Sequence, residues 1–243
     1  MERKEFLKKG IIGLGSIIAL PKVVTSCSND ASDITEENST DDLSYQNTST
    51  TSSDCTISPT ETKGPFPIKT PADLVRENII SDRTGVPLLI TLTVQDQSDN
   101  CSVLEGVYVD VWHCDKDGYY SEYGGTQMQQ VDFTDVHFLR GRQLTDTNGQ
   151  VSFLSIYPGW YSGRAPHIHL EVKDKNNNSL KVTQTAFPED ISNQVYATNG
   201  YNGSADTSNS RDNIFSDSLD QNMLDSLTGN IIDGFTLLKT IVV

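Results

Sequence analysis

Basic residues are scarce in this 243-residue chain. It has 18 Lys and Arg against 33 Asp and Glu, a formal net charge of −15. A protein that binds nucleic acid needs a basic face to neutralise phosphates. The charge balance therefore excludes a nucleic-acid partner, although it says nothing about the fold. Histidine is rarer still, with four in the whole chain, so the position of each one bears on function.

A long apolar run is also missing near the N-terminus. The run Gly10–Leu20 follows basic residues at positions 3, 4, 8 and 9, and it is too short to span a bilayer as a stop-transfer helix. Such a pattern is typical of a signal peptide. Cys27, which follows Val24-Thr25-Ser26, fits a lipobox, in which the cysteine is lipidated after cleavage.

We therefore predict a lipoprotein signal peptide over residues 1–27 and a protein exported and lipid-anchored to the bacterial cell envelope, with the membrane reached through Cys27. An ordinary signal peptide with an incidental cysteine is the alternative. The Arg3-Lys4 pair resembles a twin-arginine export signal but has Lys in place of the second Arg. The export route therefore stays open.

Residues 28–54 lack Lys and Arg and have almost no apolar side chains, but they include seven acidic residues. Such a segment cannot bury enough surface to offset the entropy of ordering its chain. We predict a disordered tether over 28–54 that holds the body away from the membrane. Residues 55–243 fit a single domain by length.

The chain has four cysteines and no CxxC pair of the kind found in zinc and redox sites. If Cys27 carries lipid, then Cys55, Cys101 and Cys114 are left. Export permits a disulfide, but three cysteines cannot all pair. The sequence leaves the connectivity open.

Short runs rich in β-branched residues predict strands, whereas helical periods are few. An Asn148-Gly149 pair between extended runs indicates a hairpin. We expect short helices near 71–78 and 188–197, and long loops over 198–228. The pattern predicts an all-β fold, an antiparallel β-sandwich with long loops and few short helices. The expected strands are 88–94, 106–112, 150–156, 166–172, 179–187 and 235–243.

Two of the four histidines, His167 and His169, lie one residue apart in a strand-like run. Alternate residues of a strand share a face, so both imidazoles could reach one metal ion while Ile168 faces the other layer. Two hydrogen-bonded histidines on a strand are the alternative. Tyr161 shortly before this strand, and Tyr120 after an earlier turn, could be further ligands or packed aromatic residues.

Two tyrosines with two histidines indicate a hard trivalent metal. A phenol has a pKa near 10 in water, and the charge of a bound ferric ion can remove that proton. Calcium or magnesium would need carboxylates, and zinc would more usually recruit Cys or a third His. A cupin would need a glutamate several residues beyond the His-x-His pair and then another histidine. Glu171 follows too closely for a cupin, and no histidine comes after His169.

These motifs, in this order, resemble those of the intradiol ring-cleavage dioxygenases, the family that includes catechol and protocatechuate dioxygenases. The matching segments run from about residue 60 to residue 187 and cover most of the predicted body. They are Thr60–Phe66, Val109–Asp115 with Gly118–Ser121, Arg140–Gln143 with Thr145-Asp146, Tyr157–Tyr161, Arg164–His169 and Thr183-Gln184.

The resemblance implies specific site residues. The four iron ligands of the family fall on Tyr120, Tyr161, His167 and His169. Tyr120, rather than Tyr119, matches because the family ligand comes eight residues after the tryptophan. The catalytic arginine of the family falls on Arg164, and a glutamine near the substrate ring falls on Gln184.

The resemblance also implies a reaction. The enzyme would use non-haem Fe(III) and no organic cofactor, and it would incorporate both atoms of O₂ into a catechol-type substrate. Tyr161, by position the axial tyrosine, would take one of the two protons that the catechol gives up. The ring would open between its two hydroxylated carbons to give a muconate-type diacid, with Arg164 stabilising negative charge on the substrate.

The sequence departs from the family pattern at two points. Pro67 takes the place of a second aromatic residue, from which we expect an altered pocket rim. The predicted tether replaces a helical segment that cytoplasmic members use to dimerise, so the oligomeric state stays open. His113 is expected to be structural rather than a ligand. The catechol derivative that the enzyme uses is left open as well, because it depends on loops around 64–86 and 188–228.

The alternative function is a non-catalytic, transthyretin-like β-sandwich lipoprotein at the cell surface that binds a small ligand or a partner. Such a module should lack at least one of the matching site residues, and this sequence lacks none. A copper or zinc hydrolase on the same fold fits poorly, because two phenolate-type ligands are unusual for that chemistry.

Overall fold

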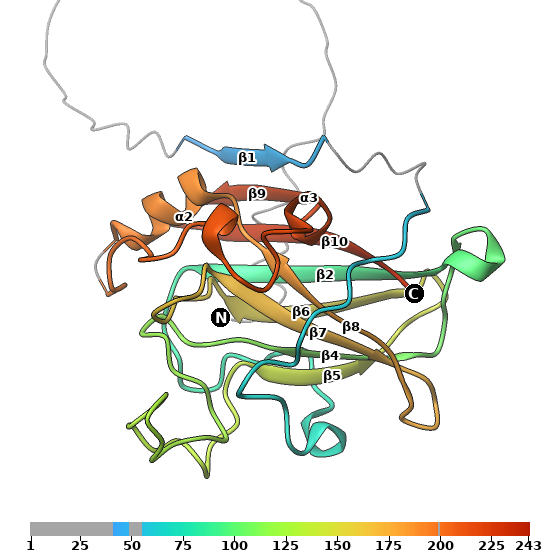
Figure 1. The fold of residues 1–243 in the computed structure, drawn as a ribbon, viewed down its shortest axis with the longest axis horizontal. Coiled ribbons are helices and arrows are strands. Elements are labelled where there is room, and N and C mark those ends of the chain that lie inside the picture. The colour runs from blue at the N-terminus through green and yellow to red at the C-terminus, as the bar shows by residue number, and fades with distance from the viewer. Residues whose placement is uncertain (1–40, 49–54, 199) are drawn as a thin grey trace, which may run out of the picture. The chain divides into compact units, whose positions relative to one another are not determined.

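The computed structural model describes residues 41–48, 55–198 and 200–243, and two β-sheets stacked on each other form its framework (Figure 1). In the six-stranded sheet, β1, β9, β10, β2 and β3 follow in this order and β6 pairs with β2. The strands of this sheet are β1 (Leu43–Gln46), β2 (Pro87–Asp96), β3 (Ser102–Val103), β6 (Gln150–Ile156), β9 (Ser226–Asn230) and β10 (Gly234–Val242).

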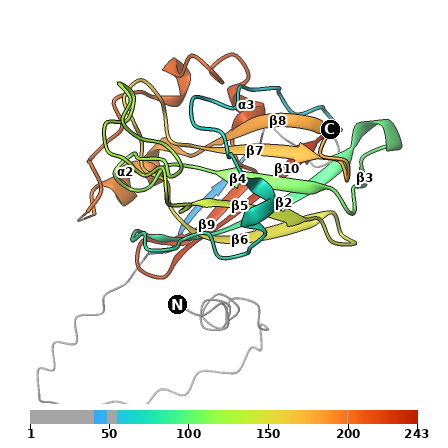
Figure 2. The same cartoon turned by 90° about the horizontal axis from the view of Figure 1, so that it is seen from below.

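The four-stranded sheet has the order β5-β4-β7-β8, and Figure 2 shows these strands side by side. Its strands are β4 (Tyr108–Trp112), β5 (Arg140–Leu144), β7 (His167–Lys173) and β8 (Ser179–Ala186). The helical segments are short: η1 (Pro71–Leu74), η2 (Gln97–Asp99), α2 (Glu189–Tyr196), η3 (Asn209–Arg211) and α3 (Leu219–Asn222). The predicted all-β sandwich with few short helices is confirmed.

The core lies between the two sheets because, in strands of both sheets, every second side chain is apolar and points toward the other sheet. Leu88, Ile90 and Leu92 of β2 are fully buried and belong to the same cluster as Ile168 and Leu170 of β7. Burying each such side chain contributes about 1.5–3 kcal/mol. The same alternation turns His167 and His169 to the opposite face of β7, away from the core.

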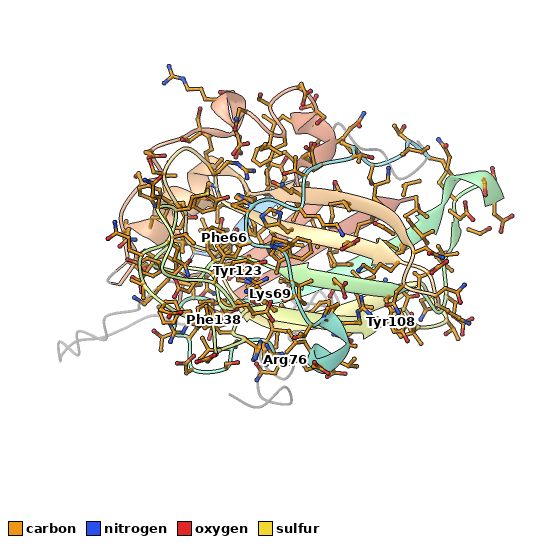
Figure 3. All side chains as sticks on the ribbon, turned by 60° about the horizontal axis from the view of Figure 1, so that its bottom comes forward. Phe66, Lys69, Arg76, Tyr108, Tyr123 and Phe138 are labelled. Atoms are coloured by element: carbon orange, nitrogen blue, oxygen red, sulfur yellow. A yellow bond between two sulfur atoms is a disulfide. The ribbon has the colours of Figure 1, made fainter. Side chains whose placement is uncertain are left out.

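A strap, defined here as residues 58–70, crosses that opposite face of the four-stranded sheet. Its Glu61 N–H donates to the Val182 carbonyl of β8 (2.9 Å), and the Lys63 ammonium pairs with Glu171 of β7 (2.6 Å). Figure 3 shows Phe66 and Lys69 of the strap near Tyr123. The strap therefore covers side chains that would otherwise face solvent.

All six predicted strands are present, as is the helix predicted at 188–197, whereas the one at 71–78 is limited to η1. The hairpin predicted at Asn148-Gly149 is wrong. The turn exists, with Gly149 at φ +69, but it joins β5 of one sheet to β6 of the other. The reason is that β6 pairs with β2 instead of β5. Between the named strands of the described residues, pairing is antiparallel except that β10 runs parallel to β2.

The prediction of disorder over residues 28–54 is wrong at Leu43–Gln46. This segment forms β1 and pairs antiparallel with β9. Leu43 and Tyr45 pack against the core, so tertiary contacts order a segment whose composition is polar. Residues 28–40 and 49–54 of the predicted tether, and the predicted signal peptide 1–27 with Cys27, lie outside the described residues. In the part of the chain that the structure describes, no helix is long and apolar enough to cross a membrane.

The open question of disulfide pairing has an answer in the structure. Cys55 is bonded to Cys101, with a Cα–Cα distance of 5.7 Å, and Cys114 is a buried free thiol. The bond fixes the chain just before the strap begins.

Replacing both Cys55 and Cys101 with serine is expected to lower the free energy of unfolding by about 3–4 kcal/mol, because the disulfide closes a 46-residue loop in the unfolded chain. Guanidinium titration of the wild type and the double variant measures the difference. Dithiothreitol should destabilise the wild type and leave the variant unchanged. Equal stability of the two oxidised proteins would contradict the prediction.

Candidate metal centre

Two imidazoles of β7 form the base of the candidate site. His167 and His169 are almost fully buried, and their Nε2 atoms lie 3.2 Å apart. The His167 Nδ1 is 2.6 Å from the Ala165 carbonyl oxygen, so we assign the ring proton to Nδ1. This tautomer leaves the Nε2 of His167 as an acceptor that faces the Nε2 of His169, and an unprotonated Nε2 is the form that binds a metal ion.

Both imidazoles are neutral in this environment. Burial, followed by the nearby Arg164 guanidinium, lowers the pKa of His167 to about 3. Burial also holds the pKa of His169 well below its ordinary value, and the neighbouring His167 adds to the effect. A neutral imidazole is the form that binds metal ions.

Two tyrosines complete the ring of side chains around these nitrogens. The ring centroid of Tyr120 is 5.8 Å from that of Tyr161 and 6.1 Å from that of His169, and Tyr161 is 5.7 Å from His167. The Tyr120 side chain is fully buried, and its hydroxyl has no hydrogen-bond partner among the described residues. Burial raises the pKa of both phenols, so each stays protonated unless a positive charge arrives.

A turn decides that Tyr120, and not Tyr119, enters the site. The Asp115 carboxylate accepts from the backbone N–H of Tyr119 (2.9 Å), and the Tyr119 ring lies against Phe133. The Gln129 side chain accepts from the Tyr120 N–H (2.7 Å) and donates to the Tyr120 carbonyl (2.8 Å). Gln129 comes from a loop that carries no sequence signal for this role, so the sequence alone does not predict it.

His169 is held between two close neighbours. The indole of Trp112 stacks parallel to its ring with centroids 5.0 Å apart. On the strap, Gly64 has φ +65, and a Cβ added there would lie 2.8 Å from the Cε1 atom of His169. Only glycine lets the backbone come this close in this conformation.

Arg164 and Gln184 lie at the same site. The Arg164 Nη2 donates to the Gln184 Oε1 (2.6 Å), and its Nη1 is 3.4 Å from the Tyr161 hydroxyl. Gln184 of β8 is paired in register with His169, which brings its side chain to the site. The buried carboxylate of Asp212, a residue that the sequence alone does not single out, accepts from the Arg164 Nε (2.8 Å).

These residues fit a hard trivalent metal ion. The two Nε2 atoms lie 3.2 Å apart, close enough for both to bind a single ion. Leaving a buried hydroxyl such as that of Tyr120 unpaired costs about 1–3 kcal/mol, which a metal bond would offset. Among the described residues no group of three or more His, Cys, Asp or Glu is placed to hold a metal, and the two phenols are the further oxygen donors beside the imidazoles.

The other two histidines have partners elsewhere. His113 is buried, with its Nδ1 2.7 Å from the Cys114 carbonyl oxygen and its Nε2 2.7 Å from the Ser155 hydroxyl. Burial lowers the pKa of His113 to about 4, and its contacts fit the predicted structural role. The His137 Nδ1 is 2.9 Å from the carboxylate of Glu122.

Comparison with known proteins places these features in a family. A family model described as dioxygenase matches residues 64–199, more than half of the chain. Chlorocatechol 1,2-dioxygenase of Rhodococcus opacus is 28% identical over 129 residues, which are 45% of this chain and 47% of that protein. The chain thus spans about half the length of this curated relative.

Two solved structures have a similar fold. The intradiol ring-cleavage dioxygenase from Tetranychus urticae matches with a TM-score of 0.68 and 28% identity, covering 77% of this chain and 94% of that one. The dioxygenase domain of a carbohydrate-binding fusion protein from Streptomyces sp. SirexAA-E matches with a TM-score of 0.55 and 25% identity, covering 77% and 98%. On this evidence, and with the resemblance of its motifs, the chain belongs to the intradiol ring-cleavage dioxygenase family.

Proposed function

We propose that this protein is a non-haem Fe(III) enzyme that cleaves a catechol-type ring between its two hydroxylated carbons, using O₂ and giving a muconate-type diacid. Family membership supports the reaction class. The observation that supports a metal ion is the buried Tyr120 hydroxyl, which has no hydrogen-bond partner in the part of the chain that the structure describes. It lies near two neutral imidazoles whose Nε2 atoms face each other.

In this proposal Tyr120, Tyr161, His167 and His169 hold the ferric ion. Bound there, Fe(III) would supply Lewis-acid chemistry, binding the two catechol oxygens and drawing electron density from the ring. Its charge would also lower the pKa of the phenols, opposite to the effect of burial alone.

The side chains around the donors have their own tasks. With the ferric ion bound, the Tyr161 oxygen, which is near Arg164, would be a phenolate and would accept one of the two protons that the catechol releases, while hydroxide takes the other. The Arg164 guanidinium stabilises the negative charge that results on the substrate, as fixed positive groups do in a site that excludes water. Gln184 accepts a hydrogen bond from Arg164 and so limits the directions that the guanidinium can take.

A binding module without catalysis is the competing function. It would not need two phenols, two imidazoles and an arginine with its own buried carboxylate in one place. We also propose, from the N-terminal sequence, that the protein is exported and attached to the membrane at Cys27.

The purified full-length chain loaded with iron is expected to be coloured and to change its visible band when catechol is added without oxygen, because a catecholate and phenolates then share the ferric ion. Admitting O₂ should consume the catechol, yield a muconate and restore the first spectrum. The same chain loaded with zinc is the control and should stay colourless and inactive. Failure to bind iron would favour the binding module. A coloured protein whose visible band does not change when catechol is added would indicate that the substrate is a larger diol.

A further inference from the structure

Asp212 lies 48 positions after Arg164 in sequence, in the loop between α2 and β9, and its side chain is fully buried. Its Oδ2 accepts from the Nε of Arg164 and from the backbone N–H of Ala165, both at 2.8 Å. Its Oδ1 accepts from the backbone N–H of Ile214 at 2.9 Å. Charge-assisted contacts of this kind are what allow a carboxylate to be buried.

The contact with Asp212 restricts where the guanidinium of Arg164 can point. With Nε held by Asp212 and Nη2 held by Gln184, Nη1 is the nitrogen directed at the Tyr161 hydroxyl, 3.4 Å away. A guanidinium is planar and rigid, so fixing two of its nitrogens fixes the direction of the third.

The segment between α2 and β9 also contacts Gln184, the second partner of Arg164. Asn222, the last residue of α3, donates from its side chain to the backbone carbonyl of Gln184 (3.0 Å). Asp212 and Asn222 therefore both act on Arg164, the first directly and the second through Gln184.

Asp212 also reaches the histidine side of the site. It holds the N–H of Ala165, and the carbonyl of Ala165 accepts the Nδ1 proton of His167 at 2.6 Å. One carboxylate thus supports the arginine and the residue that sets the tautomer of a candidate ligand.

We propose that Asp212 is a positioning residue for the ring-cleavage reaction, acting through Arg164 and Ala165. This inference rests on the proposed function. Asp212 touches neither substrate nor metal in this proposal. Its part is to keep the positive group of Arg164 aimed at the place where negative charge develops.

Asp212→Asn is expected to lower kcat by about tenfold to a hundredfold, the range that a small misplacement near the reacting groups can cost. Asparagine keeps the volume and one acceptor, so the fold and the iron content should be retained, whereas the melting temperature should fall because the buried Arg164 loses its charged partner. KM should change much less than kcat, because the loss concerns charge that develops after binding. The matched control is Asp217→Asn, an exposed carboxylate five residues later, which should leave kcat unchanged.

A double-mutant cycle with Arg164→Gln separates positioning from a general structural effect. In the Arg164→Gln background, Asp212→Asn should change kcat by no more than about twofold, since the group to be positioned is gone. The same loss in both backgrounds would overturn the proposal, as would an Asp212→Asn enzyme with the kcat of the wild type. If Asp212→Asn does not fold, Arg164→Lys replaces it. Lysine keeps the positive charge but lacks the planar, forked set of donors of the arginine guanidinium. Full activity of Arg164→Lys would therefore overturn the proposal.

Hydrogen exchange of the Arg164 Nε–H, measured by NMR on the metal-free full chain, tests the contact without activity. We expect protection in the wild type and its loss in Asp212→Asn, and an unprotected wild-type group would overturn the proposal. If the wild type binds iron but cleaves no catechol, the proposed function fails while this measurement still decides whether Asp212 holds Arg164.

Discussion

Replacing His167 with alanine is expected to abolish stoichiometric iron binding and, with it, catechol turnover. The imidazole provides one of two nitrogens whose separation fits a single ion. Its removal also leaves a cavity beside His169 and Tyr161. Loss of an outer-shell partner already costs about 10–100-fold in metal affinity, so loss of a ligand should exceed about a hundredfold.

Iron analysis and the visible spectrum of the purified variant measure this effect. His137→Ala is the matched control, because His137 is partly exposed and paired with Glu122, and it should keep its iron and colour. A His167→Ala protein with a full iron complement and an unchanged band would show that the metal centre is elsewhere.

Arg164→Gln is expected to lower kcat by about a hundredfold to a thousandfold, the cost of removing one preorganised group that stabilises developing charge. Iron content should be retained, because Arg164 is not a donor. The glutamine also leaves the carboxylate of Asp212 buried without its charged partner, so the melting temperature should fall as well.

Steady-state kinetics with catechol measure the fall in kcat, and a thermal melt measures the fall in melting temperature. Arg211→Gln, an exposed arginine in η3 of the same loop, provides the comparison and should behave as the wild type. A kcat within about twofold of the wild type for Arg164→Gln would remove Arg164 from the mechanism.

The strands that the sequence predicted correctly are those whose own side chains alternate. In β7 the apolar residues Ile168 and Leu170 alternate with His167 and His169, and local periodicity alone indicates both faces. The sequence missed β5, because Arg140 and Arg142 look like surface residues. In the structure both are buried, and Arg140 donates to the Phe66 carbonyl of the strap while Arg142 pairs with Asp110.

The candidate ligands could be predicted because they lie in motifs with characteristic spacing. Asp212 and Gln129 could not, because each sits in a loop and works on residues of another segment. A lone Asp in a polar loop carries no local signal, and only the folded chain shows that it faces Arg164. The same holds for β1, where pairing with β9 decides the structure of a polar segment.

The strap has a consequence for the order in which the molecule forms. Its contacts join segments far apart in the chain, with 108 positions between Lys63 and Glu171 and 74 between Phe66 and Arg140. Closing such large loops costs entropy before the contacts repay it, so folding that depends on them is slow. Gly64 and Phe66 come to rest on His169 and Tyr120 only in that step. The cover of the site is therefore placed by long-range contacts, and an ion entering the proposed metal centre would meet a more open site before those contacts form.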